Sequence, residues 1–282
     1  MFHLIDSDND LFILDKELSK GGLVAVDTEF RRRGKEEIDL SLIQVNDSEE
    51  TFIIDCLKIG KYKNNCKFLS SDRVKKIFHS CREDLDAIFS WTQLPLKNVF
   101  DTQLANEFLG GSFSVGYQEI IKEKFGVFIA KDETRSNWIK RPLRESQLKY
   151  AASDVEHLID LFNFQKEELD LTGKIDWFNE EIVILLNKIL FQEGRDDFKI
   201  SKNFFPKKEE ERLLKRFNEI VVSTSKEENI NSTMFFSKKS QRDFLKTSLC
   251  NGIESALSDI SRWKKELLLE EIYPLFNDFS IN

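Results

Sequence analysis

The stretch that most constrains the fold is residues 24–30, VAVDTEF, which place two acids inside an otherwise apolar run. The β-branched residues of this run favour a strand buried inside a sheet. Asp27 and Glu29 are two residues apart, so their side chains leave the same face of that strand. Neighbouring carboxylates repel each other, and burying either one without a partner is costly. A divalent cation such as Mg²⁺ or Mn²⁺ would remove this conflict, whereas a strand that runs out into solvent at Asp27 would avoid it.

Length and composition indicate a globular protein with one large part and one smaller part. The 282 residues are 40% hydrophobic and 33% charged, which is enough to bury a substantial core. Residues 1–11 do not have the pattern of a signal peptide, and the longest apolar run, residues 182–186, is too short to span a bilayer. The four cysteines have no C-x-x-C spacing, which argues against a zinc site or a disulfide framework. We therefore expect a cytoplasmic protein with free thiols and no membrane partner.

The net charge of −8 argues against a nonspecific nucleic-acid binder. It does not exclude a polyanionic substrate, provided that basic residues gather locally. Two segments are locally basic, residues 31–35 and residues 131–143. The first is either a phosphate-gripping loop or a solvated turn. In the second, we expect Trp138 to anchor the loop in the core rather than to stack on a base.

The order of the predicted elements indicates a mixed sheet. Three consecutive strands at 24–30, 38–46 and 51–54 are joined by short loops, which predicts an antiparallel meander. Helices and strands then alternate, so helices should cover the faces of a single sheet. Further strands are expected at 2–5, 77–79 and 98–100, and helices at about 7–18, 71–76, 82–91, 101–109, 116–125, 145–162 and 177–191. Beyond a polar linker at 194–206, short amphipathic helices are expected at 210–222, 240–249, 253–263 and 265–276.

Two acidic positions follow the strand acids along the chain. Glu83, Asp84 and Asp86 lie in the first turn of a predicted helix, where acids also interact favourably with the helix dipole. Asp154 could simply be a polar residue on an exposed helix face. However, Tyr150 precedes it by four residues and so lies on the same side of the helix. A tyrosine hydroxyl in that position can hold and orient a metal-bound water.

These acids lie in three segments that resemble the motifs of the DEDD exonucleases, with sequences VDTEF at 26–30, FHSCREDL at 78–85 and QLKYAASDV at 147–155. The tyrosine of the third segment resembles that of the DEDDy branch. The segments DTQ at 101–103 and RSNWIKRPL at 135–143 are similar to those of ribonuclease D. The resemblance covers about residues 1–190 and implies an α/β fold, with a ribonuclease H-like mixed-sheet exonuclease domain.

The resemblance also implies roles for individual residues. The spacing from His79 selects Asp84 over its acidic neighbours. The implied catalytic residues are Asp27, Glu29, Asp84, Tyr150 and Asp154. The four acids among them would hold two divalent cations, Mg²⁺ or Mn²⁺, and Tyr150 would orient a water. We further expect substrate contacts from Arg31, Arg135, Arg141 and His79, although His79 is also read as a core histidine whose hydrogen bonds are satisfied within the protein.

The implied activity is that of a 3′–5′ exoribonuclease, which removes 5′-mononucleotides from RNA 3′ ends. Its expected substrates are tRNA precursors, in 3′-end maturation, or other small RNAs, and no obligate protein partner is evident. The alternatives are a DNA 3′–5′ exonuclease of the same fold and an inert nucleic-acid-binding scaffold. RNA and DNA differ at the 2′-hydroxyl, and no residue of the three motifs reports a contact to that group.

The C-terminal part departs from the family pattern. Full-length ribonuclease D has two helical HRDC modules after its catalytic domain, and this chain has room for one. We therefore expect an exonuclease domain at 1–193, a linker at 194–206 and a small all-α, HRDC-like domain at 207–282. Within that last domain, residues 235–245 carry most of the resemblance.

Overall fold

The computed structural model describes residues 2–34, 37–60, 66–130, 132–190 and 207–277. Six strands form one mixed sheet in the order β1-β4-β3-β2-β5-β6. The predicted meander is confirmed, because β2, β3 and β4 pair antiparallel, while β1 pairs with β4, β5 with β2 and β6 with β5 in parallel. The strands are β1 (Phe2–Ile5), β2 (Gly22–Arg32), β3 (Ile38–Asn46), β4 (Thr51–Asp55), β5 (Val74–Phe78) and β6 (Val99–Asp101).

Some helices of the first 190 residues begin where the sequence provides a capping side chain. The Ser7 side chain accepts the Asp10 N–H at the start of α1, and Asp101 accepts two N–H groups at the start of α5. Helix α4 packs against β2 and β3, and α8 packs against β2 and β5. These helices are α1 (Asp8–Leu18), α2 (Cys56–Ile59), α3 (Lys67–Ser70), α4 (Arg82–Thr92), α5 (Thr102–Phe108), α6 (Tyr117–Phe125), α7 (Glu145–Ser153), α8 (Leu158–Leu171) and α9 (Ile175–Leu190).

The prediction of a helix at 71–76 is wrong. A short helix, α3, ends at Ser70, and strand β5 already begins at Val74. The polar composition of this segment is misleading because Lys76 is fully buried within the strand. Its ammonium group donates to the carbonyl oxygens of Ser71 and Val74, each at 2.8 Å. A charged side chain can therefore occupy an interior strand position when its donors are satisfied by nearby backbone.

The prediction of a single helix at 145–162 is also wrong. The chain forms two helices, α7 and α8, separated by a turn at residues 154–157. Asp154 lies at the C-terminal cap of α7, where its N–H bonds to the Tyr150 carbonyl at 3.3 Å. The predicted proximity of Tyr150 and Asp154 nevertheless holds, because the two residues still lie one turn apart.

The C-terminal part is helical, as predicted, with boundaries that differ from those expected. The helix predicted at 253–263 ends at Ser258, and Trp263 instead belongs to the first turn of the last helix. The predicted linker at 194–206 lies outside the described residues. The helices of this part are α10 (Lys207–Glu227), α11 (Ser232–Phe235), α12 (Lys238–Asn251), α13 (Ile253–Ser258) and α14 (Arg262–Asn277).

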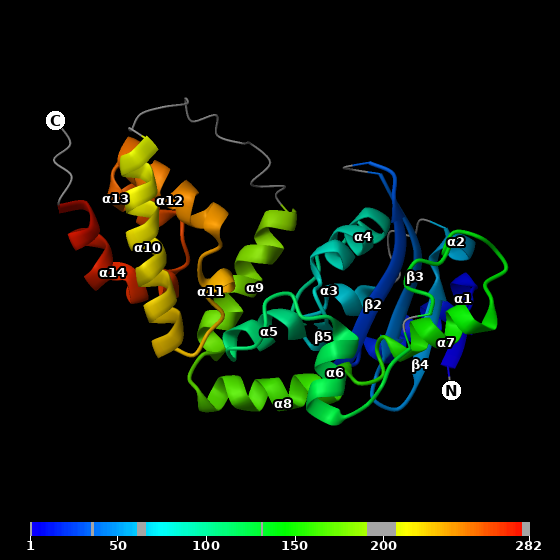
Figure 1. Ribbon diagram of the computed structural model, residues 1–282. Coiled ribbons are helices and arrows are strands. Elements are labelled where there is room, and N and C mark those ends of the chain that lie inside the picture. The colour runs from blue at the N-terminus through cyan, green and yellow to red at the C-terminus, as the bar shows by residue number, and fades with distance from the viewer. Residues whose placement is uncertain (1, 35–36, 61–65, 131, 191–206, 278–282) are drawn as a thin grey trace.

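The C-terminal helices pack on the sheet-containing part through aromatic side chains. Figure 1 shows the sheet at one end of the molecule, α10, α12, α13 and α14 at the other, and α9 between them. Trp263 is buried, and its ring centroid lies 5.2 Å from that of Phe108 and 5.2 Å from that of Trp177. The rings of Trp263 and Trp177 are stacked, with an interplanar angle of 14°. The buried apolar residues of both parts form one continuous cluster. The C-terminal helices therefore share the core of the molecule rather than enclosing a separate one.

No helix within the described residues has both the length and the apolar character needed to cross a membrane. The four cysteines are free thiols; Cys56, Cys66 and Cys81 are buried, and Cys250 is exposed.

Candidate active site

Three of the predicted acids meet at one place. Carboxylate oxygens of Asp27, Glu29 and Asp154 all lie within 4.8 Å of one another. The first two come from β2, in the middle of the sheet, and the third from the break between α7 and α8. Acids of the first and third motifs, 125 positions apart in the chain, therefore form one cluster.

The pleat of β2 explains why these acids face the same way. Asp27 pairs with Gln44 across the sheet and Glu29 pairs with Leu42, so all four side chains point to one face. On that face, Leu42 packs in a small apolar cluster with Trp138 of the basic loop and Ala151 of α7. The loop and α7 therefore cover the face on which the acids lie.

The electrostatics of the cluster are those of acids without a counter-charge. Burial, together with the charge of Asp154, raises the pKa of Asp27 well above its usual value. Burial and the charges of the neighbouring acids raise the pKa of Glu29 to about 10. Burial raises the pKa of Asp154 to about 7, against the opposing effect of a hydrogen bond from Tyr150. Without a cation, these groups cannot all be ionised together at neutral pH.

Asp84, at the start of α4, lies beside the cluster and next to Thr28. It is buried, and its carboxylate accepts a hydrogen bond from the hydroxyl of Thr28, whose side chain points opposite to Asp27 and Glu29. Burial and the charge of Asp27 raise the pKa of Asp84 well above its usual value. The sequence analysis did not identify Thr28 as a site residue. Its position between the two strand acids was the one indication that it lies at the site.

The acidic neighbours of Asp84 are used differently. Glu83 and Asp86 both bind the Arg32 guanidinium, at 2.7 Å and 3.3 Å. This arrangement distinguishes Asp84, which bonds Thr28, from the two neighbouring acids, which bind an arginine. It also gives Arg32, from the basic segment at 31–35, a place in an ion-pair network.

Tyr150 lies within reach of the cluster. Its hydroxyl forms a hydrogen bond with Asp154, and it lies 3.2 Å from the Thr134 hydroxyl. Its ring centroid is 6.1 Å from that of Trp138, which is buried and anchors the basic loop as predicted. Burial, moderated by the hydrogen bond to Thr134 and reinforced by the nearby acids, raises the pKa of Tyr150 to about 12. The hydroxyl therefore keeps its proton at neutral pH and can serve as a hydrogen-bond donor.

Two of the expected substrate contacts are occupied within the protein. Both ring nitrogens of His79 have partners at 2.9 Å, the Thr102 hydroxyl and the Val115 carbonyl. The Arg141 guanidinium binds Asp55 through two hydrogen bonds of 2.7 Å. It also donates to the Trp138 carbonyl at 2.6 Å and therefore ties the basic loop to the end of β4.

The other two expected contacts are more accessible. Arg31 is exposed and pairs with Asp39 at 3.1 Å, across the antiparallel ladder of β2 and β3. Arg135 is exposed on the basic loop, one residue after Thr134. Arg31 follows Glu29 by two residues, and Arg135 follows Thr134, whose hydroxyl lies 3.2 Å from that of Tyr150.

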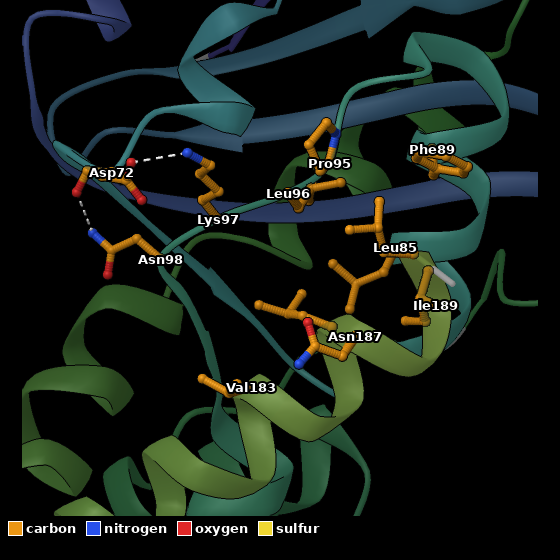
Figure 2. Close-up of a pocket in the computed structure, with 12 residues that line it drawn as sticks. Asp72, Leu85, Phe89, Pro95, Leu96, Lys97, Asn98, Val183, Asn187 and Ile189 are labelled. Atoms are coloured by element: carbon orange, nitrogen blue, oxygen red, sulfur yellow. Dashed lines mark hydrogen bonds and ion pairs between the residues drawn. The ribbon is translucent and has the colours of Figure 1, made fainter. Parts of the chain in front are cut away.

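A hollow of about 370 Å³ lies between α4, residues 95–98 and α9, and none of the cluster acids lines it. Figure 2 shows its lining, which is mostly apolar and includes Leu85, Phe89 and Ile189. One end is closed by polar contacts, since Lys97 and Asn98 both bind Asp72. None of the described residues that line it is Tyr150 or one of the four acids.

The donor set of the acidic cluster fits a hard divalent cation. All of its potential ligands are carboxylate oxygens, which suit Mg²⁺ or Mn²⁺ rather than the softer metals. Burial and mutual repulsion raise the pKa values of Asp27 and Glu29, and a bound cation would favour their ionised forms. A cluster of this kind on a central strand of a mixed sheet is suited to cation-assisted hydrolysis of anionic substrates.

The sequence comparison gives the family. Residues 2–170 match the family model described as 3′-5′ exonuclease, so the chain belongs to the 3′–5′ exonuclease family. Ribonuclease D of Pseudomonas paraeruginosa is 41% identical over 140 residues, which cover 49% of this chain and 37% of that protein. The chain is thus a ribonuclease D-like member of the family. It spans half or less of the length of these ribonuclease D relatives.

Solved structures agree with the observed fold. The crystal structure of Escherichia coli RNase D, described as an exoribonuclease involved in structured RNA processing, superposes with a TM-score of 0.63 at 20% identity, covering 99% of this chain and 75% of that one. Brucella melitensis NrnC with bound Mg²⁺ superposes with a TM-score of 0.58 at 25% identity, covering 71% of this chain and 98% of that one. The first match includes the C-terminal helices, and so confirms the predicted fold class of a mixed-sheet domain followed by a helical region.

Proposed function

We propose that the chain is a metal-dependent 3′–5′ exoribonuclease, which removes 5′-mononucleotides from the 3′ ends of RNA. The observation that carries this proposal is the meeting of Asp27, Glu29 and Asp154 within 4.8 Å in a family of 3′–5′ exonucleases. The ribonuclease D relatives favour RNA as the substrate class. By the same analogy, we propose tRNA precursors or other small RNAs as the natural substrates and the cytoplasm as the place of action.

The four acids would hold two divalent cations, Mg²⁺ or Mn²⁺. The magnesium in the similar Brucella protein supports this choice of ion. When bound, such ions activate a water and neutralise charge on the phosphate and its leaving oxygen. Asp27, Glu29 and Asp154 are close enough to share one ion, while Asp84, held by Thr28, lies to one side of the three. Because of this placement, we expect mutation of Asp84 to affect cation binding with the least disturbance of the other three acids.

Tyr150 would orient the attacking water rather than remove its proton. With a pKa of about 12, its hydroxyl is a donor at neutral pH, and it already bonds to Asp154. The Thr134 hydroxyl supports it from the basic loop. Arg31 and Arg135 are the two proposed phosphate contacts that the structure leaves exposed, whereas His79 and Arg141 would act on substrate only through the segments that they hold.

The helices from residue 207 onwards are proposed to be an HRDC-like module. The weak sequence resemblance at 235–245 supports this assignment. Because the chain spans only part of its relatives' length, its handling of structured RNA is part of the proposal.

A digestion assay tests the proposed function. A single-stranded RNA carrying a 5′ label should shorten stepwise from its 3′ end in Mn²⁺ or Mg²⁺, and the released product should be 5′-mononucleotides. EDTA should stop the reaction, and Asp27→Ala should be inactive under all conditions. A DNA of the same sequence, digested in parallel, distinguishes the two substrate classes. Faster digestion of DNA than of RNA, or activity that persists in EDTA, would contradict the proposal.

A further inference from the structure

The hydroxyl of Tyr117 occupies the break between α7 and α8. It accepts a hydrogen bond from the His157 N–H at 3.1 Å and can donate one to the Ser153 carbonyl at 3.3 Å. In an uninterrupted α-helix, the N–H of residue 157 would bond directly to the carbonyl of residue 153, four positions earlier. The Tyr117 side chain is thus inserted into that single backbone hydrogen bond. Insertion of a side chain into the backbone ladder is a recognised cause of helix breaks.

The segment that Tyr117 spans contains Asp154. Ser153 is the last residue of α7, and His157 is the residue immediately before α8. The His157 side chain makes no capping hydrogen bond for α8. The hydroxyl therefore grips both ends of the turn at 154–157, and this turn carries the one carboxylate of the cluster that does not come from β2.

Tyr117 is itself held from the same end of the sheet. It is 8% exposed, and its ring centroid lies 5.8 Å from that of His79. Two residues before it, the Val115 carbonyl accepts hydrogen bonds of 2.9 Å from His79 and from Gln103. Burial raises the pKa of Tyr117, so its hydroxyl keeps the proton that it donates. A continuous set of contacts thus runs from the end of β5 through Tyr117 to the turn at Asp154.

We propose that Tyr117 is a positioning residue for Asp154, because its hydroxyl holds the helix open at residues 154–157 and so directs this carboxylate towards Asp27 and Glu29. Without the hydroxyl, the His157 N–H and the Ser153 carbonyl can bond to each other, and the turn can rewind towards a helix. Asp154 then moves relative to the strand acids. This inference rests on the proposed function, since it concerns cation binding by these three carboxylates.

The variant Tyr117→Phe tests the idea, because it removes one oxygen and keeps the ring. Mn²⁺ binding is measured on the folded protein by calorimetry and by the electron paramagnetic resonance signal of free Mn²⁺, well below the melting temperature found by circular dichroism. The dissociation constant should rise about tenfold, at the lower end of the range for residues that support metal ligands. Hydrolysis of single-stranded RNA should need correspondingly more Mn²⁺ and return towards the wild-type rate at saturation.

Tyr273→Phe is the matched control. Its hydroxyl also bonds a partner, Glu254, but it lies on α14 in the C-terminal part. Mn²⁺ affinity should be unchanged in this variant. A purely structural role for Tyr117 would instead lower the melting temperature and leave Mn²⁺ affinity within twofold of the wild type, which would overturn the proposal.

A double-mutant cycle with Asp154→Asn shows whether Tyr117 acts through Asp154. If it does, adding Tyr117→Phe to Asp154→Asn should change Mn²⁺ affinity by less than twofold, because the residue it positions is already disabled. Equal weakening in both backgrounds would overturn the positioning role while leaving the proposed cation site intact. Wild-type Mn²⁺ affinity in Asp154→Asn alone would overturn the cation site, and the positioning role with it.

Discussion

Glu29 and Glu181 are two partly buried glutamates of the same molecule in opposite surroundings. Around Glu29, burial and three neighbouring acids raise the pKa to about 10. Burial also acts to raise the pKa of Glu181, but Lys264 and donors from Ser261 and Trp263 outweigh it, and the net pKa is lowered. The Trp263 indole N–H donates at 2.9 Å, and the Lys264 ammonium lies 3.1 Å away. Among the described residues, no hydrogen bond or ion pair reaches the Glu29 carboxylate, whereas three side chains bind Glu181.

This difference distinguishes a region suited to binding a ligand from a region whose internal contacts stabilise the fold. Glu181 joins α9 to α14, and its satisfied carboxylate stabilises the packing of the C-terminal helices on the rest of the chain. The cluster of Glu29 is destabilising in isolation, because like charges lie close together in a site that excludes much of the water. Natural folds keep such a conflict mainly at functional sites, where a ligand resolves it. The comparison therefore predicts opposite responses to mutation and to pH in the two regions.

The largest effect is expected from Asp27→Ala. Loss of a ligand that stabilises transition-state charge should lower kcat/KM for RNA by about 10⁴ or more, which corresponds to roughly 5 kcal/mol. The melting temperature in EDTA should not fall, because one source of repulsion is removed. Asp86→Ala is the matched control, since this acid binds Arg32 outside the cluster. Full activity in Asp27→Ala would show that the cluster is not the active site.

A smaller loss of rate is expected from Tyr150→Phe. If the hydroxyl orients the attacking water, kcat should fall roughly 10²–10⁴-fold, as for a positioned proton-transfer group. Mn²⁺ affinity should stay close to that of the wild type, because the four carboxylates are intact. Stopped-flow or gel assays at saturating Mn²⁺ give kcat, and calorimetry gives the affinity. A variant with normal kcat and a reduced melting temperature would assign Tyr150 to the core instead.

In the C-terminal part, Trp263→Ala should act on stability. Removing a buried indole typically costs about 3–5 kcal/mol, and the melting temperature should fall by about 10 °C. Thermal unfolding followed by circular dichroism measures this shift. Phe128→Ala is the control, since that aromatic ring is 79% exposed, and its melting temperature should barely change. Equal melting temperatures for both variants would mean that the C-terminal helices do not stabilise the rest of the chain.

Glu181→Gln should destabilise the protein by about 1–3 kcal/mol at pH 7, because Lys264 loses its ionised partner. The lowered pKa of Glu181 contributes stability above the unfolded value near 4.5, and this contribution is lost as the pH falls through the folded value. The variant and the wild type should therefore converge in stability at low pH. Urea unfolding at pH 7 and at pH 3 gives the two differences, and a gap that persists unchanged at pH 3 would exclude this ion pair as its source.

The acidic cluster should show the opposite pH dependence, with a still smaller amplitude. A carboxyl whose pKa is raised by folding stabilises the fold while protonated, and loses that effect as the pH rises through its folded pKa. For Asp154 this window runs from about 4 to about 7, and for Glu29 it extends to about 10. In EDTA the free energy of unfolding should fall by about 1–2 kcal/mol between pH 5 and pH 8, after allowance for partial exposure.

Two controls accompany this measurement. Asp154→Asn should flatten the pH dependence, because one of the titrating groups is gone. Saturating Mg²⁺ should restore stability at pH 8, because a ligand that binds only the folded state stabilises it. Stability in EDTA that rises from pH 5 to pH 8 would show that the acids are already compensated within the protein.

Much of the site was determined by the sequence alone. The period of a strand places Asp27 and Glu29 on one face, and the four-residue spacing places Tyr150 beside Asp154 even though the helix ends there. Local caps at Ser7 and Asp101 set where α1 and α5 begin. These features depend on backbone geometry and on neighbours within one or two turns. The local sequence is therefore sufficient to predict them.

The tertiary structure decided what local pattern could not. The apolar periodicity of residues 145–162 predicts one helix, but the hydroxyl of Tyr117, 36 residues before Ser153, enters its backbone ladder and opens it at Asp154. Lys76 can lie buried in a strand because nearby carbonyl groups accept hydrogen bonds from its amino group. The C-terminal helices dock where Trp263 meets Phe108 and Trp177. Each outcome depends on contacts that the local sequence pattern does not specify. Such contacts contribute to stability only after folding has brought the residues together.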